Sequence, residues 1–133
     1  MGVAVSREEF EQIVERAIAG IPARFRARME NLSVSVEGWG PGRDLLGLYE
    51  GRPLTERSVS DGFAPPDRIR IFQKAHEEMA RSRSELEQTV ADTVWHEVGH
   101  YFGLNEFEIA RVEARRGRLR ALRGRAKTYN TRR

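Results

Sequence analysis

The chain has 133 residues, enough for one domain around a single hydrophobic core and too few for two. It contains no cysteine, which excludes a disulfide framework and a thiolate metal site. Lysine and arginine number 23 against 20 acidic residues, a formal net charge of +3, and no apolar run approaches the ~20 residues of a membrane span. We therefore expect a single-domain cytoplasmic protein without membrane contact, in which histidine and carboxylate side chains hold any metal.

The charge is distributed unevenly along the chain. Residues 111–133 hold ten basic residues and one acidic residue, a local balance of +9, which leaves 13 basic and 19 acidic residues, or −6, for residues 1–110. We divide the chain into a domain at residues 1–114 and a basic C-terminal extension at residues 115–133. The extension could bind nucleic acid, but Tyr129 is its only aromatic residue, so base stacking is not supported and a solvated tail is preferred.

The first part of the chain predicts a helix followed by two strands. Ser6 and Glu9 have the spacing of a capping box, and apolar residues recur behind them at helical intervals as far as Ile21. Apolar and polar residues then alternate over residues 32–37, which predicts a half-buried strand. A second short strand is expected at residues 45–50, beyond a loop rich in glycine and proline.

The middle of the chain predicts a loop, a third strand and two helices. Residues 55–66 are polar and rich in turn formers, and we expect a mobile flap near the functional site. Residues 68–72 predict a strand whose two arginines point outward, and a short helix follows at residues 74–81. A second capping box, Ser84 to Glu87, predicts the start of a long helix that ends near Phe102. Three short strands with several helices indicate an α+β fold.

The predicted chemistry lies at the end of this long helix. His96 and His100 are four residues apart, so one helix face presents both imidazoles to a single ion, with Glu97 beside them. In this H-E-x-x-H pattern two neutral imidazoles hold Zn²⁺, and the glutamate is the general base for a zinc-activated water. Gly103 can end the helix in a left-handed turn, which would return Glu106 as a third ligand and leave the fourth zinc position open.

These residues resemble the bacterial minimal zincin family of small zincin-like metallopeptidase domains. Besides H-E-V-G-H-Y-F-G at residues 96–103, the resemblance extends to L-G-L-Y-E-G at residues 46–51 and to I-R-I-F at residues 69–72, so it covers most of the chain. It implies a compact minimal zincin-like α+β fold, in which a small twisted sheet of about three or four strands packs against the active-site helix.

The resemblance also implies the ligand set. The family motif usually ends in aspartate as the third zinc ligand, and this chain has Glu106 at that position. Glu108 and Glu113 are the alternatives for the third ligand. A Met-turn is not evident, because Met79 precedes the motif and no methionine follows it.

The predicted function is that of a zinc metallopeptidase acting on an unidentified peptide or protein, in a chain that could form a homodimer. One alternative is a zincin-like interaction module with weak or no activity, because so short a chain leaves little wall for a substrate cleft. The other is nucleic-acid binding through the basic extension. The oxyanion donor that a zinc hydrolase needs could come from one of three tyrosines, Tyr49, Tyr101 or Tyr129. His76 lies among charged residues, and we expect it to be solvated and outside the site.

Overall fold

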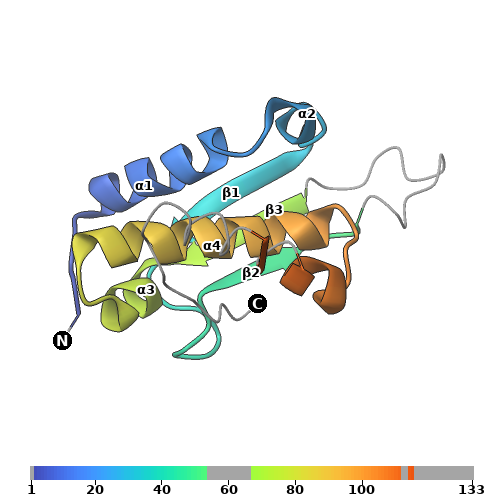
Figure 1. Ribbon diagram of the computed structural model, residues 1–133. Helices are drawn as coiled ribbons and strands as arrows, with labels where there is room; N and C mark the ends of the chain where they lie inside the picture. Colours follow the sequence, from blue (N-terminus) through green and yellow to red (C-terminus); the bar gives the residue numbers. More distant parts are fainter. Residues whose placement is uncertain (1, 54–66, 112–113, 116–133) are drawn as a thin grey trace.

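The structure, a computed structural model, describes residues 2–53, 67–111, 114 and 115. The predicted flap and nearly all of the basic extension, including Tyr129, lie outside the described residues, as does Glu113. The described part is a small three-stranded sheet with helices, which is the predicted compact α+β fold (Figure 1).

The first helix, α1 (Arg7–Ala19), begins at the predicted capping box. The Glu9 N–H donates to Ser6 Oγ at 3.0 Å, and the Ser6 N–H donates back to Glu9 Oε1 at 3.2 Å, so two N–H groups that the helix leaves unpaired are satisfied. Behind the cap, apolar side chains at helical spacing face the core. The short helix α2 (Ala23–Arg26) follows Pro22.

The sheet consists of β1 (Leu32–Glu37), β2 (Gly47–Glu50) and β3 (Asp67–Phe72) in the order β1-β3-β2. The central strand β3 runs parallel to β1, with Val36 opposite Ile71, and antiparallel to β2. All three strands fall where the alternation of apolar and polar residues predicts them. The outer strand β2 is the one that contacts the long helix most extensively.

Two helices complete the chain up to the motif: α3 (Gln73–Met79) and α4 (Arg83–Tyr101). The predicted start of α4 at Ser84 is wrong, because the N-cap is Ser82, whose Oγ accepts from the Glu85 N–H at 3.0 Å. Both serines have a glutamate three residues later, and the earlier start is stabilised by Glu85, which accepts from the backbone N–H of Arg81 at 2.8 Å. The earlier start also lets Leu86 lie fully buried.

The helices α1 and α4 lie side by side on one face of the sheet (Figure 1), and the core lies between them and the strands. Leu86, Val90, Val94 and Val98 follow one another along α4 at intervals of one turn, and each is at most 2% exposed. Burial of side chains of this size contributes about 1.5–3 kcal/mol each. This row of contacts holds α4 against α1 and β3 and thereby positions the motif at its far end.

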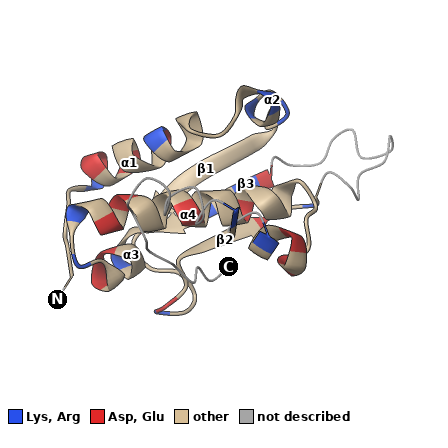
Figure 2. Ribbon diagram, in the orientation of Figure 1, with Lys and Arg blue, Asp and Glu red and all other residues tan. Residues whose placement is uncertain are grey.

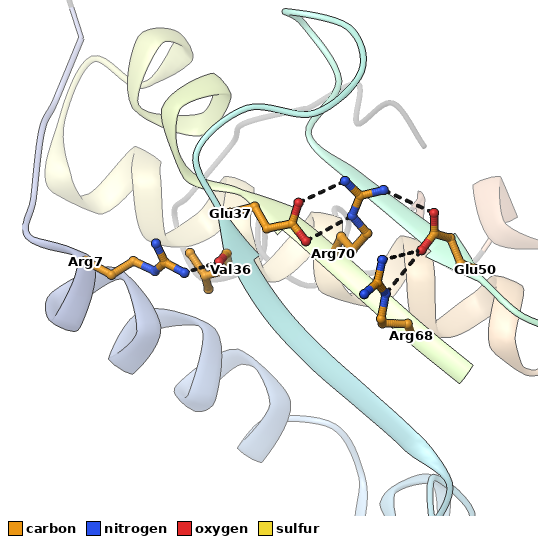
Figure 3. A network of polar contacts seen from close by, with 6 residues as sticks. All are labelled: Arg7, Val36, Glu37, Glu50, Arg68 and Arg70. Atoms are coloured by element: carbon orange, nitrogen blue, oxygen red, sulfur yellow. Dashed lines mark hydrogen bonds and ion pairs between the residues drawn. The ribbon is translucent and has the colours of Figure 1, made fainter. Parts of the chain in front are cut away.

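The opposite face of the sheet is polar. Arg70 of β3 donates to Glu37 of β1 at 2.9 and 3.0 Å and to Glu50 of β2 at 3.1 Å, and Arg68 also donates to Glu50, at 3.0 Å. Figure 3 shows Arg70 between the two carboxylates, so one guanidinium joins all three strands. Hydrogen bonds from Arg70 lower the pKa of Glu37, and those from Arg68 lower the pKa of Glu50.

Charged residues of both signs occur on α1 and on α4 (Figure 2). In the part of the chain that the structure describes, no helix combines the length and the apolar character that crossing a membrane requires.

Candidate metal centre

The last two turns of α4 carry His96, Glu97 and His100. The side chain of His96 is 6% exposed and that of His100 is 20% exposed, and the two rings meet edge to face with their centroids 5.1 Å apart. The helix thus presents both imidazoles on one face, as their spacing predicts. Glu97 is 1% exposed and lies on the buried side of the same turn.

The end of α4 reverses the chain through a Schellman motif. The Gly103 N–H donates to the His100 carbonyl at 2.9 Å, and the Leu104 N–H donates to the Gly99 carbonyl at 3.0 Å. These are the two hydrogen bonds that define the motif, and they require a left-handed residue between them. Gly103 has a φ of 83°, which glycine adopts without strain, so the predicted glycine turn is confirmed.

A second helical segment, residues 106–111, begins directly after the turn. The Glu108 N–H donates to Asn105 Oδ1 at 2.8 Å, and the Asn105 N–H donates to Glu108 Oε1 at 2.8 Å, which is a reciprocal cap. Ile109 is 2% exposed and packs against Gly99 of α4. This docking holds Glu106, the first residue of the segment, in front of the histidines.

The structure brings His96, His100 and Glu106 together as a group that could hold a metal ion. Each offers one ligand atom, and these atoms lie within 4.8 Å of one another. The His96 Nε2 is 3.6 Å from Glu106 Oε1, and the His100 Nε2 is 3.0 Å from Glu106 Oε2. Tetrahedral ligands at 2.0–2.2 Å from one zinc ion are about 3.4 Å apart, so the two distances lie on either side of the required spacing.

The chemistry of this donor set also suits zinc. Two imidazole nitrogens and one carboxylate oxygen make three protein ligands, and a catalytic zinc site takes a fourth from water or substrate. Glu106 is 62% exposed, so solvent reaches the group from the side of the carboxylate, while the buried His96 closes the opposite side. The geometry therefore fits an open zinc site more closely than a closed structural one.

The sequence profile of the zincin-like metallopeptidases matches residues 18–116, a span that runs from α1 through the complete motif. The chain belongs to the zincin-like metallopeptidase family. Membership of this family implies a protein that binds zinc. A solved structure of a conserved hypothetical protein from Thermo thermophilus has the same fold: its TM-score is 0.50 at 24% sequence identity, and the alignment covers 85% of this chain and 99% of that one. No curated protein matches the chain.

Of the three candidate third ligands for this zincin-like centre, the structure places Glu106 beside the histidines. The Glu108 carboxylate accepts from the Asn105 N–H instead, as part of the cap of the same segment. Glu113 lies outside the described residues. The cap and the ligand thus come from neighbouring glutamates with different tasks.

Glu97, the predicted general base, lies against β2. A Cβ added to Gly47 would be 3.4 Å from Glu97 Cγ and 2.8 Å from Thr93 Cγ2. Only a residue without a side chain lets α4 approach the outer strand this closely, and that approach buries Glu97 beside the sheet. The requirement for glycine at position 47 cannot be recognised from one sequence, because it depends on the packing of α4 on β2.

Two of the three candidate oxyanion donors in this zincin-like domain have structural hydrogen bonds. The Tyr49 hydroxyl donates to Asp67 Oδ2 at 2.6 Å, and the Tyr101 hydroxyl donates to the Arg28 carbonyl at 3.0 Å. The third, Tyr129, lies outside the described residues.

The expectation that His76 is solvated is wrong. Its side chain is fully buried beneath Phe10, whose ring centroid is 5.8 Å from that of the imidazole. Burial lowers the pKa of His76 to about 4, against a smaller opposing effect of the hydrogen bond to the Phe72 carbonyl. His76 stands outside the group of candidate ligands, as expected, but its second ring nitrogen contacts Thr93 on the motif helix.

Proposed function

We propose that this chain is a zinc-dependent metallopeptidase in which His96, His100 and Glu106 hold the zinc and Glu97 is the general base. The observation that carries the proposal is the meeting of three ligand atoms at the spacing of a zinc site, with an acid in the same helical turn. Family membership supports it, because the profile that matches the chain is that of metallopeptidases.

Each residue has one task in the proposed reaction. Zinc, when bound, supplies a Lewis acid that polarises the scissile carbonyl and acidifies water. Glu97 takes the proton of the attacking water and passes it to the leaving amine, a transfer that needs an acid within hydrogen-bond reach of the water. Burial of Glu97 between α4 and β2 restricts its rotamers and keeps its carboxylate away from bulk solvent.

A peptide substrate is favoured by the position of β2. This strand is the outer strand of the sheet on the side of the motif helix, and it hydrogen-bonds to β3 along its inner side. An extended peptide can add to the outer side of such a strand through backbone hydrogen bonds, which bind it independently of its sequence. We propose that the substrate binds along β2 in this way and brings a peptide bond to the zinc.

The test is digestion of a broad peptide library by the zinc-loaded wild-type chain and by Glu97→Gln. The account predicts cleavage by the wild type and a loss of about 10²–10⁴-fold in rate for the variant, with zinc still bound to both. Equal cleavage by the two proteins would reject Glu97 as the base. Absence of any cleavage by a wild type that holds zinc would favour the interaction module over the peptidase.

A further inference from the structure

The buried imidazole of His76 connects α3 to the motif helix. Its Nδ1 lies 2.9 Å from the Phe72 carbonyl oxygen, and its Nε2 lies 2.9 Å from Thr93 Oγ1. Both His76 and Thr93 are completely buried. Because a carbonyl only accepts, Nδ1 carries the hydrogen, and the Nε2 of the neutral ring is then an acceptor for the Thr93 hydroxyl.

Thr93 stands between this imidazole and the sheet. Its hydroxyl contacts His76 on α3, while its methyl group lies close to Gly47, where an added Cβ would be 2.8 Å from Cγ2. One side chain therefore fixes α4 from two directions. The same hydroxyl lies 3.0 Å from the Thr89 carbonyl, which already accepts the helical N–H from one turn later, so the helix does not depend on this contact.

The contact lies one turn before the chemistry. Glu97 is four residues after Thr93, on the same face of α4, and its Cγ is close to the same glycine. His96 is three residues after Thr93 and belongs to the candidate ligands. A rotation of α4 about its axis would move both side chains together, and the His76 contact opposes that rotation.

We propose that His76 is a positioning residue for the metal centre, which acts through Thr93 Oγ1 to set the rotation of α4 and thereby the placement of His96 and Glu97. This inference rests on the proposed function, since it assigns a task toward the zinc site proposed above. It gives the buried histidine, which the proposed reaction does not use, a role at the centre without contact with metal or substrate.

The experiment measures metal binding by the full chain, with zinc and cobalt as the probes. Thr93→Val removes the hydroxyl and keeps the shape, Thr93→Ser keeps the hydroxyl, and His76→Leu removes the imidazole. Zinc affinity is measured by competition with a chromophoric chelator, at a temperature where thermal unfolding shows each variant to be fully folded. The visible absorption of bound Co²⁺ reports the ligand geometry, which a loss of stability alone would not change.

The proposal predicts that Thr93→Val and His76→Leu weaken zinc binding by about tenfold, near the lower end for partners behind a metal ligand, and alter the cobalt spectrum. Thr93→Ser should stay within about twofold of the wild type. Folded valine and leucine variants with wild-type affinity and spectrum would overturn the positioning role while leaving the zinc site intact. A wild type that binds neither metal would overturn the zinc site itself and the positioning role with it.

Discussion

Gly99 of α4 and Ile109 of the following segment are in contact, and a Cβ on Gly99 would lie 2.9 Å from Ile109 Cγ1 and 3.2 Å from its Cδ1. Carbon atoms do not approach so closely, so a larger residue at position 99 must displace the isoleucine. Ile109 and Glu106 belong to the same short helical segment. The smallness of Gly99 therefore lets the third candidate ligand reach the histidines.

Gly99→Ala should weaken zinc binding by roughly tenfold, comparable to loss of a partner behind a metal ligand. Stability should change by no more than about 1–2 kcal/mol, because the gain in helix propensity offsets part of the overpacking. The control is Gly20→Ala, where the added Cβ meets nothing closer than 3.4 Å. Chelator competition gives the affinities, and equal affinities for the two variants would contradict the docking role of Gly99.

Glu106 and Glu108 form a matched pair for identifying the third ligand. Glu106→Gln should cost more zinc affinity than the ~10–100-fold typical of a partner outside the ligand set, because a charged ligand is lost. Glu108→Gln should leave zinc affinity within about twofold, because an amide oxygen can still cap Asn105. A larger loss from Glu108→Gln than from Glu106→Gln would show that the ligand assignment is inverted.

His76 should make folding stability depend on pH. Its pKa is about 4 in the folded chain and 6.5 in the reference state, so between these values the unfolded chain binds a proton that the folded chain does not. Stability therefore falls as pH decreases through this window, by up to about 1.4 kcal/mol per pH unit. Denaturant unfolding of the wild type and of His76→Leu at pH 4.5 to 7.5 measures the difference.

The leucine variant should show a shallower dependence on pH than the wild type across that window. The other two histidines are present in both proteins, and their contributions cancel in the comparison. Parallel stability curves would show that His76 takes up a proton as easily in the folded chain as in the unfolded one.

Arg70 should contribute more to stability than an ordinary surface arginine. Its side chain is 19% exposed and it joins carboxylates on both neighbouring strands, so Arg70→Gln leaves Glu37 and Glu50 without the charge between them. We expect a loss of about 1–2 kcal/mol, against about 0.3–0.5 kcal/mol for the control Arg83→Gln, which breaks an exposed helical pair with Glu87. Denaturant unfolding at low salt measures both, and equal losses would contradict a role for the network.

The network should also respond to acid. The pKa values of Glu37 and Glu50 are lowered from 4.5, so the ionised carboxylates favour the folded state and their contribution is complete above that pH. It should be lost as pH falls below 4.5 and the two groups take up protons. In Arg70→Gln, this acid-dependent part should become smaller.

Local signals in the sequence predict most of the fold. The first helix follows from its capping box, each strand from its alternation, and the end of α4 from a glycine that must be left-handed. The start of α4 could not be decided locally, because Ser82 and Ser84 both have the required glutamate three residues later. The order of the strands is likewise set by tertiary packing.

The candidate site divides in the same way. His96, Glu97 and His100 are recognisable from their spacing alone, since one helix presents them. The burial of His76 could not be predicted, because its own short helix is polar and only the contact with Thr93 on α4 brings it inside. Gly47 and Gly99 similarly acquire their significance from elements that pack against them.

Zinc content is the most direct test of the central claim, that α4 and the segment after it form a zinc site with three protein ligands. The measurement is zinc per chain after purification without added metal, for the wild type, His100→Ala and Glu97→Gln. The account predicts about one zinc per chain in the wild type and in Glu97→Gln, and loss of zinc in His100→Ala. Equal and negligible zinc in all three proteins would contradict it.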